Sequence, residues 1–284
     1  VLLQKLFHNK KTSLARSTLS SRYRQIESTL KNGLTIGEVI QIFRKKRWII
    51  TEETKKQTNS VIKAPTSAPS RGTTAPLPAL QLSQEQEEAC QVICDKWLTP
   101  DATTPIPALI HGVTGSGKTE VYLQLISRCW EYFGKERGSN YRSQALILVP
   151  EIALTPQMTQ VFEQRFNKEV AVVHSGLKDD DRWEQMSKVF NGEVRILIGP
   201  RSAIFAPFAN LDLIVVDEEH DSSYKQLGAF SYSARDVAVV RAKIQGIQVV
   251  FGSATPSLES YTNATRGRYT LVEMKKRFNQ SNFR

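Results

Sequence analysis

Cysteine is scarce in this chain, which has three in 284 residues, and this scarcity excludes a fold built on disulfides. Long apolar runs are also missing: the longest, such as 145–149 and 213–216, are strand-sized, well below the roughly 18–20 residues of a membrane span. With 40% hydrophobic and 23% charged residues, the composition is globular and excludes general disorder. We therefore expect a protein of a reducing compartment, and exclude membrane, secreted and fibrous classes.

Acidic residues are few at the start of the chain. Residues 1–63 carry 14 basic and 4 acidic side chains, whereas the rest carries 24 of each. The whole net charge of +10 therefore lies in the first fifth of the chain. A basic head on a neutral body indicates an anionic polymer as ligand, with a solvated basic face that binds nothing as the alternative.

A proline-rich segment divides the chain in two. Residues 64–80 hold four of the twelve prolines beside Ser, Thr and Gly, so we expect an extended linker over 59–81. Before it, residues 1–58 show three short apolar helical patches and then a basic, aromatic run, which is compatible with a small winged-helix-like DNA-binding domain. The candidate DNA contacts in that run are Lys45, Lys46 and Arg47.

From residue 82 onward, short apolar segments alternate with helical ones. The predicted strands are apolar throughout, which is typical of parallel strands that helices cover on both faces. They lie at 108–110, 145–149, 170–173, 194–198, 213–216 and 249–251, between predicted helices at 83–97, 118–133, 156–166, 179–190, 234–245 and 256–265. Thr155 and Thr255, each followed by proline, are predicted helix N-caps. The pattern predicts a doubly wound α/β domain.

A glycine-rich sequence follows the first predicted strand and precedes a helix. It has the G-x-x-x-x-G-K-T pattern of a phosphate-binding loop, in which backbone N–H groups and the helix N-terminus surround phosphate oxygens. We expect Lys118 to neutralise the β- and γ-phosphates of ATP and the Thr119 hydroxyl to bind Mg²⁺. A turn that binds nothing is the alternative. The predicted ATP-binding residues here are Gly112, Thr114, Gly115, Ser116, Gly117, Lys118 and Thr119.

Two carboxylates end the predicted strand 213–216. Asp217 fits the ligand that holds Mg²⁺, and Glu218 fits the base that orients and deprotonates the attacking water, so Lys118, Asp217 and Glu218 form the predicted catalytic set. A solvated acidic turn is the alternative. After strand 249–251, small hydroxyl residues can link the nucleotide site to a neighbouring surface, although alone they indicate a helix N-cap. The predicted coupling residues are Gly252, Ser253, Ala254, Thr255 and His220.

These motifs together resemble a known family. The DEEH sequence at 217–220 and GSAT at 252–255 resemble the first motor lobe of a superfamily-two helicase. The longer strings at 112–122, 149–157, 174–177, 201–208 and 217–226 closely resemble the PriA family of bacterial primosomal replication-restart helicases, over roughly 82–275. The resemblance implies a RecA-like ATP-binding lobe at 82–275, a winged helix before it, and a connection to a second lobe starting at 276–284. The chain is then part of a longer protein.

The resemblance also implies residue roles. Gln86 is the candidate that reads adenine, with a plain helix start as the alternative. Aromatic and basic residues at 224–232 resemble the family's aromatic-rich loop, although loop aromatics can also cap a core. The implied DNA contacts are Pro150, Glu151, Arg201, Ser202, Tyr224, Lys225, Phe230 and Tyr232. The family's zinc module would follow Arg284, and Cys90 and Cys94 are interpreted as core thiols.

The implied activity is ATP-dependent 3′→5′ DNA translocation that restarts replication at stalled forks. The implied partners are forked and single-stranded DNA, primosome proteins, the replicative helicase or its loader, and single-strand binding protein, in the bacterial cytoplasm at the nucleoid. The alternatives are a non-catalytic DNA-binding scaffold for primosome assembly and a P-loop kinase, which the basic head does not favour.

Overall fold

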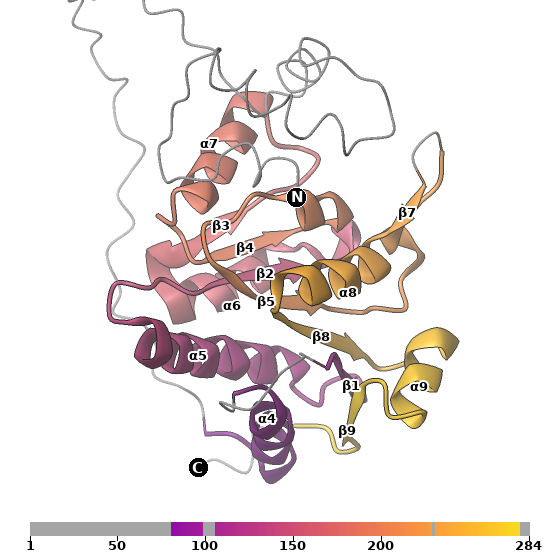
Figure 1. The fold of residues 1–284 in the computed structure, drawn as a ribbon. Helices are drawn as coiled ribbons and strands as arrows, with labels where there is room; N and C mark the ends of the chain where they lie inside the picture. Colours follow the sequence, from indigo (N-terminus) through magenta and orange to yellow (C-terminus); the bar gives the residue numbers. More distant parts are fainter. Residues whose placement is uncertain (1–80, 99–105, 229–230, 279–284) are drawn as a thin grey trace, which may run out of the picture. The chain divides into compact units, whose positions relative to one another are not determined.

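The computed structural model describes residues 81–98, 106–228 and 231–278 (Figure 1). The predicted winged-helix-like segment 1–58, with Lys45, Lys46 and Arg47, lies outside these ranges. So do residues 59–80 of the predicted linker, Phe230, and residues 279–284 of the predicted connection. The domain boundaries stay predictions.

Seven parallel strands form the central sheet, in the order β3-β4-β2-β5-β8-β1-β9. Their bounds are β1 (Ala108–Gly112), β2 (Gln144–Leu148), β3 (Val170–Val172), β4 (Ile196–Gly199), β5 (Leu211–Val216), β8 (Gln248–Ser253) and β9 (Thr270–Met274). All six predicted strands are present. The edge strand β9 was not predicted, because its partly exposed sequence Thr-Leu-Val-Glu-Met lacks the continuous apolar run of the central strands.

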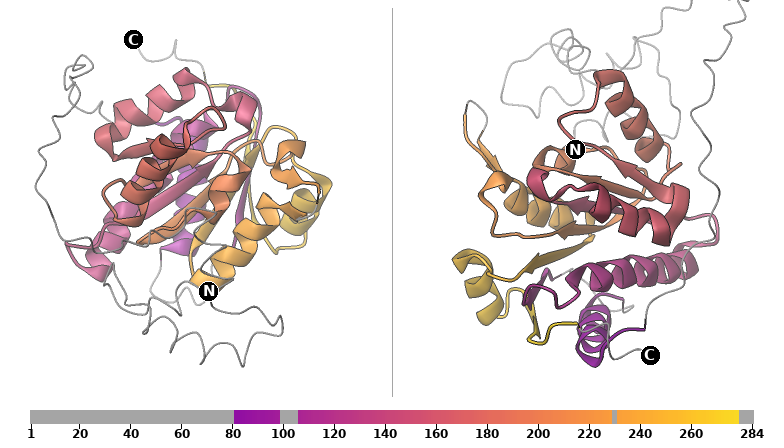
Figure 2. Two further views of the ribbon diagram at one scale, coloured as in Figure 1. Left: turned by 90° about the horizontal axis from the view of Figure 1, so that it is seen from above. Right: turned by 180° about the vertical axis from the view of Figure 1, so that it is seen from behind.

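Helices cover both faces of the sheet, as the two further views in Figure 2 show. On one face lie α4 (Gln84–Trp97), α5 (Lys118–Arg137) and α6 (Pro156–Phe166). On the other lie α7 (Asp179–Phe190), α8 (Ala234–Gln245) and α9 (Leu258–Thr265). Strand β5 shows why the strands are apolar throughout: Leu213 and Val215 pack in the first core, and Ile214 and Val216 in the second. The predicted doubly wound α/β fold is confirmed.

Shorter elements join these helices and strands. They are the 3-10 helices η1 (Glu151–Ala153), η2 (Asn167–Glu169), η3 (Arg201–Phe205) and η4 (Ser222–Tyr224), and the two-stranded hairpin of β6 (Lys225–Gln226) and β7 (Tyr232–Ser233). The hairpin is antiparallel and leads directly into α8. Ser233, the last residue of β7, is also the N-cap of α8.

The first residues of α6 and α9 show whether the two predicted N-caps are correct. Thr155 is the N-cap of α6, since its side chain accepts a hydrogen bond from the Met158 N–H at 3.3 Å. The prediction for Thr255 is wrong: α9 begins at Leu258 with Ser257 as its N-cap. The Thr255 N–H is instead held at 3.0 Å by the Ser253 hydroxyl, so the chain turns before the helix starts.

The three cysteines are free, and Cys90 and Cys129 are buried. Burial raises the pKa of the Cys90 thiol to about 12, which fits a core thiol. Within the described ranges, no group of three or more His, Cys, Asp or Glu side chains could hold a metal ion. Over the same part of the chain, no helix is long and apolar enough to cross a bilayer.

Candidate nucleotide-binding site

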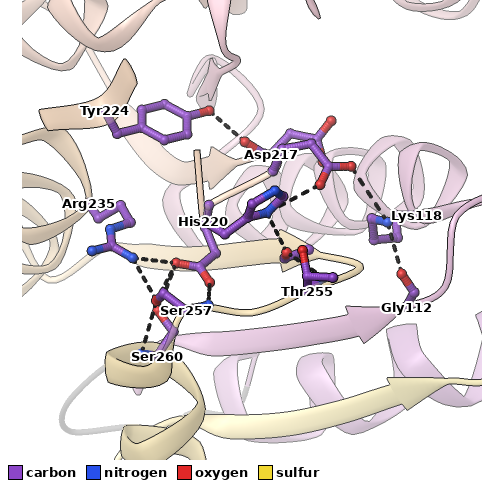
Figure 3. Close-up of polar contacts among 12 residues, drawn as sticks. Gly112, Lys118, Asp217, His220, Tyr224, Arg235, Thr255, Ser257 and Ser260 are labelled. Carbon is purple, nitrogen blue, oxygen red and sulfur yellow. Dashed lines mark hydrogen bonds and ion pairs between the residues drawn. The ribbon is translucent and has the colours of Figure 1, made fainter. Parts of the chain in front are cut away.

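The glycine loop joins β1 to α5 at the carboxyl edge of the sheet. Gly115 and Gly117 have φ values of 81° and 84°, in the left-handed region that side chains disfavour. A Cβ at Gly117 would also lie 2.2 Å from Gln86 Nε2. The Lys118 ammonium closes the loop by donating a hydrogen bond to the Gly112 carbonyl at 3.0 Å (Figure 3). Glycine at positions 115 and 117 therefore allows this tight turn.

The loop matches a phosphate ligand in its polar groups. The Ser116 hydroxyl is buried and has no hydrogen-bond partner among the residues that the structure describes, and Lys118 is also buried. A buried hydroxyl and ammonium at a helix N-terminus suit the oxygens of a phosphate chain. Thr119, in the first turn of α5, and Asp217 supply the oxygen ligands that Mg²⁺ prefers. The residues present therefore fit a magnesium–nucleotide complex.

The two predicted halves of the site converge. Glu218 Oε1 lies 3.8 Å from Lys118 Nζ, although the residues are 100 positions apart in sequence. Beside them, Asp217 Oδ1 accepts a hydrogen bond from the Tyr122 hydroxyl at 2.8 Å. Burial raises the pKa of Asp217, and the hydrogen bond from Tyr122 opposes that rise. Tyr122, which is fully buried on α5, therefore orients the predicted magnesium ligand.

Glu218 has a strained backbone, with a φ of 45°. Such a conformation costs on the order of 1–3 kcal/mol and persists only where neighbours fix it. The Asp217 N–H donates to the Leu148 carbonyl at 2.9 Å, and the Glu219 N–H donates to the Gly252 carbonyl at 3.0 Å. The residues before and after Glu218 are therefore held by the neighbouring strands β2 and β8.

The predicted coupling residues lie next to this turn. His220 Nδ1 is 2.8 Å from Ser253 Oγ and 3.6 Å from Glu218 Oε2. Ser253 Oγ also accepts the hydrogen bond from the Thr255 N–H. Gly252, one residue earlier, faces the Tyr122 ring, and Ala254 continues the same loop. The DEEH and GSAT segments are therefore joined by direct hydrogen bonds.

Gln86 contacts the glycine loop from α4. Its Nε2 donates to the carbonyls of Ser116 at 3.3 Å and Gly117 at 3.4 Å. Its Oε1 accepts from the Ser83 N–H at 2.8 Å, which completes a capping box. Gln86 thus supports the phosphate loop and also starts a helix, and its role in reading adenine stays a prediction.

The chain that follows β9 passes over the same loop. The Phe278 N–H donates to the Gly115 carbonyl at 2.8 Å, and the Lys276 N–H donates to Glu85 Oε2 at 3.0 Å. Earlier in this stretch, the Met274 carbonyl accepts from the Val113 N–H at 3.1 Å. Residues 274–278 are therefore part of the wall of the site, which the sequence did not predict.

The predicted DNA-contacting residues after β2 and β4 are held by polar contacts. Glu151 is exposed, and its carboxylate accepts a hydrogen bond from the Ser175 N–H at 3.2 Å. Hydrogen bonding by Ser175, first through its side chain and then through this N–H, lowers the pKa of Glu151, and the charge of Arg201 adds to the effect. Arg201 Nη1 donates to the carbonyls of Ser223 and Lys225 at 2.9 and 3.1 Å. Ser202 is exposed, whereas Pro150 is buried.

Tyr224 does not have its predicted position. It is fully buried, with its hydroxyl 2.6 Å from the Asp217 carbonyl and 3.0 Å from that of Leu148. The prediction that it contacts DNA is wrong, because no face of the ring is exposed to stack on a base. On the hairpin that follows, Lys225 is exposed, and the partly exposed Tyr232 ring lies 5.0 Å from that of Phe205. Their contact with DNA stays a prediction.

Sequence reasoning missed the role of Glu219, the third residue of DEEH. Its carboxylate is fully buried and forms an ion pair with Arg235 at 2.8 Å. A buried acid and a solvated acid look alike in sequence. The available signal was Arg235 in the first turn of a predicted helix, where a cation is unfavourable toward the helix dipole unless it has a partner.

Comparison with known proteins decides the family. Residues 83–264 match the family model described as DEAD/DEAH box helicase. The chain belongs to the DEAD/DEAH box helicases. The parallel sheet with its glycine loop is thus a RecA-like helicase lobe.

Individual relatives of this helicase lobe are replication restart proteins. The chain is 48% identical to Replication restart protein PriA of Bacillus subtilis (strain 168) over 206 residues, which are 72% of this chain and 24% of that protein. It is 48% identical to the protein of the same name from Chlamydia trachomatis serovar D over 202 residues, 70% of this chain and 25% of that one. The predicted resemblance to PriA is confirmed. The chain spans about a quarter of the length of these relatives.

A solved structure is also similar to part of this chain. The structure of RecG bound to a three-way DNA junction has a TM-score of 0.48 and 22% identity, and the match covers 72% of this chain and 25% of that one.

Proposed function

We propose that this chain is the first motor lobe of a helicase that hydrolyses ATP, translocates 3′→5′ on DNA and initiates replication restart and primosome assembly at stalled forks. The observation that carries the motor assignment is the 3.8 Å approach of Lys118 to Glu218, which brings the phosphate loop and the acidic motif into one site. The identity with PriA proteins supports the restart role.

In this proposal each residue has a defined task. Lys118 stabilises negative charge on the β- and γ-phosphates, and Glu218 orients the attacking water and accepts its proton at the carboxylate. Thr119 and Asp217 would hold Mg²⁺, which when bound neutralises charge on the phosphate oxygens. Tyr122 holds the Asp217 carboxylate in place at 2.8 Å. The left-handed turn at Glu218 keeps its carboxylate beside Lys118.

The surface beyond the nucleotide site is the proposed path of single-stranded DNA. Its proposed contacts are Glu151, Arg201, Ser202, Lys225 and Tyr232, whereas Pro150 is buried next to Glu151. Gln86, which contacts the phosphate loop, is the proposed adenine contact. The proposed partners are forked DNA, primosome proteins, the replicative helicase or its loader, and single-strand binding protein, in the bacterial cytoplasm at the nucleoid.

DNA dependence of ATP hydrolysis tests this proposal. In the complete protein that contains this chain, we expect single-stranded DNA to raise the rate of phosphate release from ATP at least about tenfold. Translocation along DNA requires hydrolysis to be coupled to binding, whereas a primosome scaffold without a motor would show no DNA-stimulated hydrolysis. A P-loop kinase would instead transfer phosphate to a small acceptor at a rate that DNA does not change. Absence of DNA-stimulated hydrolysis, or such a transfer, would contradict the proposal.

The isolated chain should be nearly inactive. Helicase-type ATPases complete the site with an arginine from a second lobe, and stabilisation of this kind is worth about 10³–10⁵-fold in rate. We expect the 284-residue chain to bind ATP weakly in a calorimetric titration and to release phosphate near the background rate. Robust DNA-stimulated hydrolysis by the isolated chain would show that its site is complete on its own.

A further inference from the structure

Glu219 is the centre of a buried polar network that comprises Glu219, Arg235, Ser257 and Ser260. The Glu219 side chain is fully buried, and Oε2 accepts hydrogen bonds from Arg235 Nη1 at 2.8 Å, Ser257 Oγ at 3.0 Å and Ser260 Oγ at 2.9 Å. Its Oε1 accepts from the Ser257 N–H at 2.6 Å. Figure 3 shows Arg235, Ser257 and Ser260 converging on this carboxylate. The buried charge is therefore fully satisfied.

This Glu219 network joins three segments that are far apart in sequence. Glu219 follows the catalytic Glu218 after β5, whereas Ser257 and Ser260 lie at the start of α9, just beyond the GSAT loop. Arg235 is the second residue of α8 and also donates to Ser257 Oγ at 2.6 Å. Each segment adjoins a proposed functional element. Glu219 adjoins the turn at Glu218, Ser257 adjoins the loop 252–255, and Arg235 adjoins the β6–β7 hairpin.

Stability alone does not explain this arrangement. A buried ion pair is often no more stabilising than apolar residues of similar volume, because both charges lose their hydration. The network instead fixes geometry at a strained position. Glu219 anchors the chain directly after Glu218, whose left-handed backbone would relax if its neighbours were free to move. The direction of the Glu218 carboxylate thus depends on Glu219.

The β6–β7 hairpin is linked to the other end of the ion pair. Lys225 pairs with Ser233, and Gln226 pairs with Tyr232. Ser233 is in turn the N-cap of α8, two residues before Arg235. No loop intervenes between the hairpin and Arg235, so a shift of the hairpin moves the first turn of α8.

We propose that Glu219 and Arg235 are a positioning pair that transmits the placement of the DNA-binding hairpin to the Glu218 carboxylate; this inference rests on the proposed DNA-dependent ATPase. DNA bound to Lys225 and Tyr232 determines the position of β7. The position of β7 determines that of the Arg235 side chain, and the ion pair of Arg235 with Glu219 determines the position of the loop that carries Glu218. Both residues are buried, and in this proposal they act only through Glu218.

The test measures ATP hydrolysis by the complete helicase with and without saturating single-stranded DNA. We expect Glu219→Gln and Arg235→Lys each to lower the DNA-stimulated kcat by about 10- to 100-fold, as misplacement of a catalytic group by about 1 Å does. The basal rate should fall by a smaller factor than the DNA-stimulated rate, and the affinities for DNA and for a fluorescent ADP analogue should change less than about twofold. The DNA-stimulated kcat of the double variant should be no lower than that of the slower single variant, because both substitutions disrupt the same ion pair.

A buried acid elsewhere on β5 provides the matched control. Asp212, at the amino end of the strand, is 1% exposed and pairs with Arg137 at 2.8 Å. Asp212→Asn should lower thermal stability and leave the ratio of DNA-stimulated to basal rate unchanged. Should Glu219→Gln fail to fold, Ser260→Ala removes a single donor from the network and should lower the same ratio by a smaller factor.

Two results overturn the proposal. In the first, Glu219→Gln leaves the ratio of DNA-stimulated to basal rate unchanged; in the second, Asp212→Asn lowers this ratio as much as Glu219→Gln does. Either would show that the network has only a structural role. Absence of DNA stimulation in the unmodified helicase would contradict the proposed function itself, so the two failures are distinguishable.

Discussion

Glu218→Gln in the complete helicase should slow DNA-stimulated ATP hydrolysis by about 10²–10⁴-fold, the range that a general base contributes. Glutamine has nearly the same shape, and its amide can occupy the same place beside Lys118 Nζ and His220 Nδ1, which lie 3.8 Å and 3.6 Å from the Glu218 carboxylate. It cannot take a proton from water at neutral pH. Nucleotide affinity should therefore stay within about twofold of that of the unmodified protein, measured by titration with a fluorescent ADP analogue.

Two further variants define what the result means. Lys118→Ala should weaken both nucleotide binding and hydrolysis, because Lys118 belongs to the loop that surrounds the phosphates. Glu184→Gln, at an exposed acid on α7, should change neither. A Glu218→Gln rate within about fivefold of the unmodified rate would show that another group activates the water.

Gly252→Ala should destabilise the lobe severely. A Cβ at this position would lie 1.6 Å from Tyr122 Oη and 2.8 Å from Tyr122 Cζ. Tyr122 is fully buried and hydrogen-bonded to Asp217, so the ring has no space into which it could move. Overpacking of this kind costs about 3 kcal/mol, which corresponds to a fall in Tm of roughly 6–12 °C for a domain of this size. Circular dichroism of the purified chain during heating measures the shift.

Gly134→Ala is the matched control for that substitution. Gly134 lies inside α5, and nothing comes within 4 Å of a Cβ built there. Alanine in a helix interior is more stable than glycine by roughly 0.5–1 kcal/mol, so Tm should rise slightly. A Gly252→Ala chain that unfolds within about 2 °C of the unmodified protein would mean that β8 and α5 can separate without cost.

The convergence of the two halves of the candidate site was predictable because of sheet geometry. The phosphate loop and the acidic motif both follow strands that are apolar throughout, and parallel strands end at a common edge where ligands bind. Lys118 and Glu218 were therefore expected to meet, and they lie 3.8 Å apart. The resemblance to PriA proteins added the assignment of these motifs to a helicase motor.

Features that depend on the direction of a side chain were not predictable. Tyr224 and Tyr232 both lie in an aromatic, basic segment, yet the first is fully buried under Asp217 and the second is partly exposed. Tyr224 ends the three-residue helix η4, whereas Tyr232 lies in strand β7. The sequence of so short a helix does not show which of its side chains points into the core. Glu219 was missed for a similar reason: its donors come from α8 and α9, which only the folded sheet brings together.

Strand β9 and the residues after it affect how the lobe can be divided. β9 supplies every hydrogen-bonding neighbour that β1 has on one side, and residues 276–278 reach the carbonyl of Gly115 and the α4 carboxylate Glu85. Truncation at residue 264, where the family match ends, would turn β1 into an exposed sheet edge that invites pairing between molecules. The shortest segment that preserves the ATP site therefore extends to Phe278, beyond the last helicase motif in this chain.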